Sequence, residues 1–148
     1  MRLLTIFLAL SILTIACKNK AGGGQTEKSA ERDDLPKDFL AFYQQFHTDS
    51  AYQMAHIEWP LKGEKSENLE TGGTRKVLHI WEPENWTMLR LPDLTDVGLK
   101  SSYETTGDAL ITERLQYPMV NFGLERQFFK EENNEWKLIY YSEMQELK

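Results

Sequence analysis

The chain has 148 residues, with 17 basic and 23 acidic side chains and a formal net charge of −6 at pH 7. This length allows one domain of ordinary size with its own core. An acidic balance without a basic stripe disfavours nucleic-acid binding, because a polyanion is repelled by such a surface. The single cysteine excludes a disulfide framework and a cysteine-based metal site.

The N-terminus has the pattern of a lipoprotein signal. An apolar run at residues 3–16 ends directly at Cys17. This length is typical of a secretory signal, since a membrane-spanning helix needs about 20 apolar residues. Residues 13–17, LTIAC, resemble a bacterial lipobox, although Thr14 stands where leucine is commoner. We predict a lipoprotein signal peptide at residues 1–16 and lipidation of Cys17; an ordinary cleaved signal and a short uncleaved anchor are the alternatives.

Residues 17–35 are predicted to form a flexible tether. The stretch 18–32 contains three consecutive glycines and no large apolar side chain. In Gram-negative lipoproteins, which the lipobox resembles, sorting favours the outer membrane unless an aspartate follows the cysteine, and here Lys18 follows it. We therefore expect a lipid anchor in the outer membrane, with the domain facing the periplasm. The membrane is then the first expected partner.

Residues 36–148 are predicted to form a single α+β domain that begins with two helices. Aromatic side chains recur at helical spacing, which predicts a first helix with one buried aromatic face: Phe39, Phe42, Tyr43 and Phe46. His47, near the end of this helix, is expected to carry a charge that the helix dipole favours. A second, shorter helix is expected to begin near Ser50 and to end near His56, because Ser50 and Gln53 form a capping-box pattern.

The remainder of the chain is predicted to form strands. Alternation at residues 57–62 predicts a short strand, with Pro60 at an edge or a strand end. The charged, glycine-containing stretch 63–74 has no periodicity and predicts a loop before a strand at residues 77–81. The C-terminal half predicts an antiparallel meander of strands near residues 101–106, 109–117, 122–130 and 135–141. Helices followed by long strands indicate helices packed on one side of a curved antiparallel sheet.

Residues 39–61, FLAFYQQFHTDSAYQMAHIEWPL, resemble a family of small lipoproteins from Gram-negative, mainly gut-dwelling bacteria. In that family an aromatic helix, an Asp-Ser-x-aromatic-Gln turn and an Ile-x-aromatic-Pro-Leu strand follow one another. The resemblance extends through the strand at Trp136. It implies a cone-shaped fold similar to nuclear transport factor 2, also described as cystatin-like, in which helices close a strongly bent sheet. The family has no assigned activity, and a basic residue such as arginine is usual at the position of His56.

Enzymes with the implied fold are isomerases and dehydratases that place an Asp, or a His–Asp pair, inside the cone. Candidates for that role in this chain are His56, His79, Asp108 and Glu113. Sequence separation does not establish that any of them reaches a substrate proton. The sequence contains no phosphate-binding loop, no nucleophile elbow and no paired histidine spacing for a metal. We therefore predict no catalytic residue, no metal and no cofactor.

Aromatic residues give the remaining functional indication, because the chain has four tryptophans and six tyrosines. Trp81 and Trp86 flank a proline turn, where an indole ring and its N–H suit a sugar, a peptide or a partner protein. Core packing is the alternative role. Together with His56, these tryptophans are the predicted ligand- or partner-binding residues.

These patterns predict a non-enzymatic, membrane-tethered binding domain, whose partner is an envelope protein or a small ligand. An isomerase- or dehydratase-like enzyme that uses a His, Asp or Glu in the cavity is one alternative, and an envelope scaffold without a ligand is another. An acid or histidine buried in a cavity would favour the enzyme. A cavity filled by Phe and Trp, with an apolar patch outside near Trp86, would favour partner binding.

Overall fold

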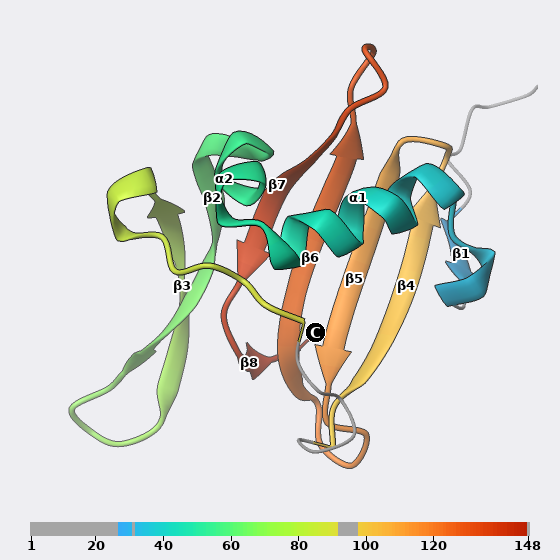
Figure 1. Cartoon of the computed structure of the whole chain (residues 1–148). Helices are drawn as coiled ribbons and strands as arrows, with labels where there is room; N and C mark the ends of the chain where they lie inside the picture. Colours follow the sequence, from blue (N-terminus) through green and yellow to red (C-terminus); the bar gives the residue numbers. More distant parts are fainter. Residues whose placement is uncertain (1–26, 31, 92–97, 148) are drawn as a thin grey trace, which may run out of the picture.

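The computed structural model describes residues 27–30, 32–91 and 98–147 (Figure 1). The predicted signal peptide, Cys17 and the first part of the tether lie outside the described residues. Within the described ranges, no helix is long and apolar enough to cross a membrane. In chain order the elements are β1 (Glu27–Ala30), η1 (Arg32–Asp34), α1 (Lys37–Thr48), α2 (Ser50–Ala55), β2 (Ile57–Asn68), β3 (Thr74–Trp81), η2 (Pro83–Asn85), β4 (Lys100–Thr106), β5 (Leu110–Gln116), β6 (Phe122–Lys130), β7 (Trp136–Ser142) and β8 (Gln145–Glu146).

The strands form one curved sheet in the order β1-β4-β5-β6-β7-β2-β3, and β8 pairs with β6. The sheet is mixed, because β2 is antiparallel to β3 but parallel to β7. Figure 1 shows α1 running across the face of β4, β5 and β6, with α2 beside it. The predicted α+β class, with N-terminal helices packed on a curved sheet, is therefore confirmed, although the sheet is not antiparallel throughout.

The predicted C-terminal meander is confirmed, since β4, β5, β6 and β7 pair in sequence and fall close to the expected ranges. Two of its turns place a residue in the left-handed region, Gly107 with φ 61° and Asn134 with φ 68°. Glycine and asparagine tolerate this region better than other residues do. The local turn chemistry therefore agrees with the strand pattern around it.

The loop predicted at residues 63–74 is wrong, because β2 continues to Asn68 and pairs with β3 as a long hairpin. The ladder runs from Leu61 opposite Trp81 to Asn68 opposite Thr74. Most side chains along it are half-buried or exposed, so the stretch carries no apolar alternation. Backbone hydrogen bonds to β3 nevertheless form the strand, because they require no particular side chain.

The last part of the predicted tether belongs to the domain. Strand β1 pairs with β4 from Glu27 opposite Thr106 to Ala30 opposite Tyr103, and η1 follows it. An edge strand such as β4 presents unpaired backbone groups that any extended segment can satisfy. The ordered domain therefore begins before residue 36, the predicted boundary.

The core lies between α1 and the sheet, as the aromatic face of the helix predicted. Phe39 and Phe46 are fully buried, and the Phe39 ring centroid lies 5.4 Å from that of Phe128 and 5.0 Å from that of Trp136. Edge-to-face contacts of this kind are favourable beyond the area that they bury. All buried hydrophobic side chains of the described residues lie between Leu35 and Leu147. This part of the chain therefore supplies its own core.

Candidate functional site

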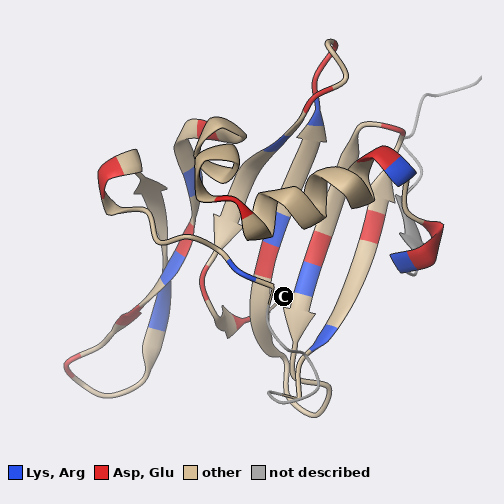
Figure 2. Ribbon diagram, viewed as in Figure 1, with Lys and Arg blue, Asp and Glu red and all other residues tan. Residues whose placement is uncertain are grey.

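A row of polar side chains crosses the sheet beneath α1. Tyr103 on β4 is directly opposite Glu113 on β5, Glu113 is opposite Arg126 on β6, and Arg126 is opposite Tyr141 on β7. Directly opposed residues lie on the same face of a sheet. Tyr43, from α1, contacts this row from above. The acidic and basic bands that lie side by side on β5 and β6 are visible in Figure 2.

Glu113 and Arg126 form a buried ion pair at the centre of the row. Glu113 Oε2 lies 2.8 Å from Arg126 Nη2, and the two side chains are 0% and 2% exposed. The hydroxyl of Tyr43 donates to Glu113 Oε1 at 2.5 Å, and the hydroxyl of Tyr103 donates to the same atom at 3.2 Å. Burial and the neighbouring carboxylate raise the pKa of Tyr103, so its phenol stays protonated as a donor. The carboxylate therefore has a counter-charge and two hydrogen bonds in a dry environment.

His47 completes the polar network from α1. Its Nε2 lies 2.7 Å from Arg126 Nη1, and its Nδ1 lies 2.7 Å from the main-chain oxygen of Tyr43. Because arginine can only donate, Nε2 must be the acceptor and Nδ1 must carry the proton. Burial and the Arg126 charge lower the pKa of His47 to about 3. The prediction that His47 is charged is therefore wrong, because the imidazole is buried beside a cation rather than exposed at the helix end.

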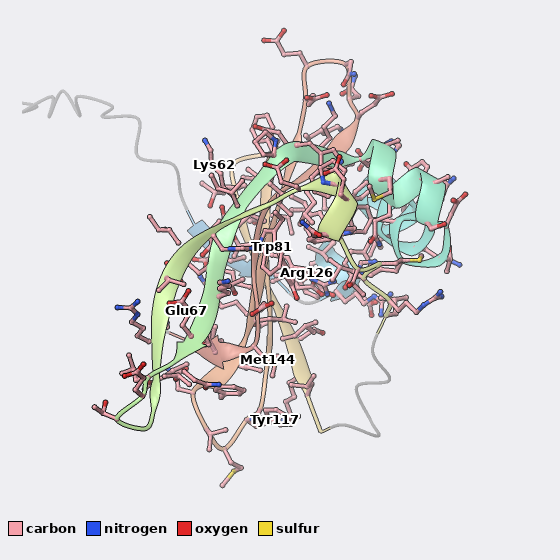
Figure 3. All side chains as sticks on the ribbon, turned by 90° about the vertical axis from the view of Figure 1, so that its left-hand side faces the viewer. Lys62, Glu67, Trp81, Tyr117, Arg126 and Met144 are labelled. Carbon is pink, nitrogen blue, oxygen red and sulfur yellow. The ribbon has the colours of Figure 1, made fainter. Side chains whose placement is uncertain are left out.

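An apolar pocket of about 280 Å³ adjoins the row. Leu115 and Leu124 are directly opposed, and each is two residues from a member of the Glu113–Arg126 pair, which places all four side chains on one face. In Figure 3, Arg126, Met144 and Tyr117 follow one another from the middle of the molecule towards its lower end. The complete lining is Leu89, Arg90, Leu99, Leu115, Tyr117, Leu124, Arg126 and Met144.

The buried guanidinium of Arg126, a lining residue of the pocket, keeps one unpaired donor. Its Nη1 reaches His47, and its Nη2 reaches Tyr43 and Glu113. Its Nε has no hydrogen-bond partner among the described residues, although the side chain is buried. A buried donor without a partner costs about 1–3 kcal/mol. Glu113, by contrast, does not line the pocket.

Gln53 holds the segment that carries Leu89 and Arg90, two lining residues of the pocket. Its buried amide nitrogen donates to the main-chain oxygens of Phe46 at 2.7 Å and Leu89 at 2.9 Å. Its side-chain oxygen accepts from the Leu89 N–H at 2.8 Å and from Trp86 Nε1 at 3.0 Å. Helix α2 is capped instead by Asp49, whose side chain accepts from the Tyr52 N–H at 3.0 Å. The predicted capping box at Ser50 and Gln53 is therefore wrong, since Gln53 makes tertiary hydrogen bonds.

The predicted binding tryptophans, Trp81 and Trp86, pack edge-on against Tyr141 in one aromatic cluster. Their ring centroids lie 5.3 Å and 5.4 Å from that of Tyr141, and all three residues line a smaller pocket of about 180 Å³. The N–H of Trp86 is bonded to Gln53. Both tryptophans are half-buried against the core, which agrees with the packing alternative, and their role in binding stays a prediction.

His56, the third predicted binding residue, lies apart from the tryptophans. Its ring stacks on Tyr52 with centroids 3.8 Å apart, and its Nδ1 lies 2.8 Å from the Tyr52 main-chain oxygen. It lines a groove of about 510 Å³ between the helices and the β6–β7 turn. The structure therefore does not bring the three predicted residues into one site, and a binding role for His56 stays a prediction.

The four catalytic candidates do not converge either. Glu113 belongs to the buried network, whereas His56 lies in the groove beside α2. His79, on β3, packs edge-on against Trp81 with centroids 4.3 Å apart, and Asp108 is exposed in the β4–β5 turn. No group of three or more His, Cys, Asp or Glu side chains in the described ranges could hold a metal ion.

Comparison with known proteins identifies the fold. No family model and no curated protein matches the chain. A nuclear transport factor 2-like protein of Bacteroides fragilis NCTC 9343 aligns with a TM-score of 0.50 and 15% identity, covering 79% of this chain and 50% of that protein. A cystatin-like protein of Bacteroides caccae ATCC 43185 aligns with a TM-score of 0.51 and 16% identity, covering 70% of this chain and 74% of that one.

The chain spans about half the length of the Bacteroides fragilis protein. At these identities the likeness extends to the arrangement of helices and strands and not to a site. Both neighbours share the helix-covered curved sheet predicted from residues 39–61 and from the C-terminal meander. The described part of this chain therefore has the nuclear transport factor 2-like, or cystatin-like, α+β fold.

Proposed function

We propose that this protein is a membrane-tethered, non-enzymatic binding domain, and that its apolar pocket takes a small ligand. The observation that carries the proposal is the pocket at Leu115, Leu124 and Arg126, with a volume of about 280 Å³ and a mainly apolar lining. Ligand sites combine apolar walls with a few fixed polar groups, and here the network beneath α1 fixes Arg126. The pocket volume lies just below the range of about 300–1,000 Å³ for drug-sized ligands, so the ligand is small.

The polar network supports binding rather than catalysis. A general base must reach the proton that it removes, and Glu113 is fully buried and paired with Arg126 at 2.8 Å. The lowered pKa of His47, about 3, makes its imidazole a weak base. A buried acid in a cavity was the feature that would favour an isomerase or dehydratase. Glu113 is buried, but it does not line the pocket.

The space beneath α1 is filled by aromatic side chains, which is one of the two features expected to favour partner binding; the other is an apolar patch outside near Trp86. Phe39, Phe46 and Phe128 are each 0% exposed, and their rings are in mutual contact through Phe128. A ligand therefore has no room among these rings and must bind in a hollow outside them. The proposed location rests on the sequence alone: residues 13–17 support lipidation of Cys17, and Lys18 after it supports an outer-membrane anchor with the domain facing the periplasm.

The proposal is tested by titrating Nile red, a neutral apolar dye, with the chain from Lys18 to Lys148, which retains the whole core. Wild-type protein should bind the dye saturably. Leu124→Gln should weaken binding about tenfold or more, because burial of a leucine side chain contributes about 1.5–3 kcal/mol. Leu78→Gln is the matched control, since Leu78 is 87% exposed on β3 and lies outside the pocket. Equal affinities of the two variants, or no saturable binding by wild type, would overturn the proposal.

A further inference from the structure

The β5–β6 turn, residues 117–122, exposes a cluster of large apolar side chains. Met119 is 92% exposed and Val120 is 56% exposed. Tyr117 and Phe122, which flank them, are 37% and 41% exposed. In Figure 1 this turn forms the lower end of the molecule, away from both helices. A contiguous apolar surface of this kind marks a place of interaction.

The β5–β6 turn also lacks charge, unlike the other strongly exposed apolar surface. No charged residue occurs within residues 115–124, and Figure 2 shows the turn in tan. Leu78 and Ile80 on β3 are similarly exposed, at 87% and 57%. They lie directly opposite Glu64 and Lys62 on β2, so burying them in an apolar medium would also desolvate charges, at a high cost. The β5–β6 turn is therefore the surface that suits an apolar partner.

Several polar groups of the turn are already hydrogen-bonded within the protein. The Tyr117 N–H donates to the Phe122 main-chain oxygen at 3.0 Å, and the Val120 N–H donates to the Tyr117 oxygen at 3.3 Å. Asn121 bonds to Leu147 in both directions: its side-chain nitrogen donates to the Leu147 oxygen, and its main-chain oxygen accepts from the Leu147 N–H at 2.8 Å. A paired polar group costs less to remove from water than an unpaired one. These bonds therefore lower the cost of placing the turn in a low-dielectric medium.

A lipid bilayer fits this surface better than a protein does. A stable protein interface has about 20–30 residues on each side, whereas this surface is the end of a single hairpin (Figure 1). A bilayer requires only that the inserted side chains be apolar and uncharged. The net charge of −6 opposes attraction to anionic headgroups. Contact with a bilayer would therefore come from apolar insertion and not from charge.

The predicted lipid anchor at Cys17 leaves the turn free to reach the same bilayer. Strand β1 begins at Glu27, opposite Thr106 at one end of β4. The turn adjoins the other end of β4, where Lys100 is opposite Gln116. At roughly 3.3 Å per residue, β4 is about 20 Å long and the turn adds about 10 Å. Glu27 is ten residues after Cys17, and a chain of that length spans up to about 33–36 Å, which is sufficient.

We propose that the apolar side chains of the β5–β6 turn insert into the interfacial layer of a lipid bilayer, so that the folded domain itself contacts the membrane. Met119 and Val120 insert, and the Tyr117 ring, with its polar hydroxyl, lies at the level of the headgroups. This contact goes beyond the proposed function, since Met119 and Val120 do not line the ligand pocket. Tyr117 does line it, so insertion also brings that pocket next to the lipid.

Vesicle binding by the unlipidated chain from Lys18 to Lys148 tests the proposal. Wild type should co-sediment with phosphatidylcholine vesicles, and high salt should not weaken this binding. Met119→Ser/Val120→Ser should bind about tenfold or more weakly, because two apolar side chains are lost from the inserted surface. Leu78→Ser/Ile80→Ser is the matched control. It removes two apolar side chains of similar exposure from β3 and should bind as tightly as wild type.

A fluorescent label in the turn locates the contact. The chain from Lys18 to Lys148 has no cysteine, because Cys17 is the only one in the sequence. Met119→Cys therefore accepts a single environment-sensitive fluorophore. On addition of vesicles, its emission should move to shorter wavelength, and lipids that carry a quencher on the acyl chain should reduce it. The same fluorophore on Leu78→Cys should show neither change. If the double serine variant does not fold, these labels still decide the matter.

Several results would overturn the insertion and leave the ligand pocket standing. These are an absence of vesicle binding by wild type, equal affinities of the two double variants, and equal responses of the two labels. Sedimentation without lipid measures the alternative partner, a second copy of the chain. A wild-type dimer that Met119→Ser/Val120→Ser converts to a monomer would assign the turn to a protein contact and overturn the proposal. Absence of saturable Nile red binding, by contrast, would overturn the ligand pocket and not the membrane contact.

Discussion

Removing the charge of Glu113 tests how much the buried ion pair with Arg126 contributes to the stability of the fold. Glu113→Gln leaves the Arg126 guanidinium buried, at 2% exposure, without the carboxylate that lies 2.8 Å away. Loss of one partner of a buried ion pair costs about 3–5 kcal/mol. A glutamine oxygen can still accept from Tyr43 and Tyr103, so this loss comes mainly from the uncompensated charge. It is a large fraction of the 5–15 kcal/mol by which a domain is typically stable.

Replacing both partners should cost much less than the single changes added together. Arg126→Gln/Glu113→Gln leaves no buried charge, and it loses the hydrogen bonds of Arg126 to His47 and Tyr43. At about 0.5–1.5 kcal/mol each, these bonds predict a loss of about 1–3 kcal/mol. The two single variants, at about 3–5 kcal/mol each, predict a summed loss of about 6–10 kcal/mol. A double-mutant cycle of Glu113 and Arg126 should therefore give a coupling free energy of roughly 3 kcal/mol or more.

Urea unfolding, followed by tryptophan fluorescence and by circular dichroism, measures these free energies with a common slope. Glu67→Gln is the matched control, because its pair with Arg75 is exposed, with side chains 41% and 63% accessible. Exposed pairs contribute about 0–1 kcal/mol. The buried-pair account would be refuted if Glu113→Gln lost as little unfolding free energy as Glu67→Gln. It would also be refuted if the double variant lost as much as the two single variants added together.

Two further changes test the histidine and the anchor. Because the pKa of His47 is lowered to about 3 from its usual 6.5, the unfolded chain binds a proton below pH 6.5 that the folded protein does not, so stability present above that pH is lost as pH falls. Between pH 7 and 4.5 this loss amounts to about 2–3 kcal/mol. In His47→Gln, the unfolding free energy should fall over the same pH range by that much less than in wild type. Parallel pH profiles of the unfolding free energy in wild type and variant would contradict this prediction. Cys17→Ser should release the protein from the membrane fraction with an unchanged circular dichroism spectrum and melting temperature. Retention of this variant after confirmed signal cleavage would show a second attachment.

The helix and the meander could be predicted because each repeats apolar residues over many positions. Period and length together fix such elements before any tertiary contact is known. The hairpin end of β2 and the strand β1 could not be predicted this way, since both are held by backbone pairing and carry few apolar side chains. The role of Gln53 could not be predicted for a related reason. The local sequence has a capping pattern, but the Gln53 side chain makes four hydrogen bonds with groups outside helix α2.

The polar network left a partial signal in the sequence. Glu113 is two residues from Leu115, and Arg126 is two residues from Leu124, so both charges occupy core-facing positions of alternating strands. A charge at such a position requires a partner, because an isolated buried charge is too costly to retain. Glu113 was a candidate on the sequence alone. Arg126 and His47 were not, because their pairing depends on the register of β5 with β6 and on the placement of α1 over both.

A glycine at the end of the polar row explains how the aromatic pocket forms. The residue opposite Tyr141 on β2 is Gly63, where a Cβ atom would lie 1.7 Å from the Tyr141 main-chain oxygen and 3.1 Å from Trp81 Nε1. The absence of a side chain there lets Trp81 pack beside Tyr141, at the end of the polar row. The aromatic pocket therefore forms beside Tyr141, whereas Arg126 lines the apolar pocket.

Leu89 joins the two pockets, because it lines both of them. Gln53 bonds to both Leu89 and Trp86, so the loss of Trp86 would disturb the segment that carries Leu89 without removing any residue of the apolar pocket's lining. Weaker binding by a Trp86→Ala variant would consequently fit a ligand in either pocket. Leu124 and Arg126 line the apolar pocket and not the aromatic one. Substitutions at these two residues, unlike one at Trp86, therefore assign the ligand to the apolar pocket.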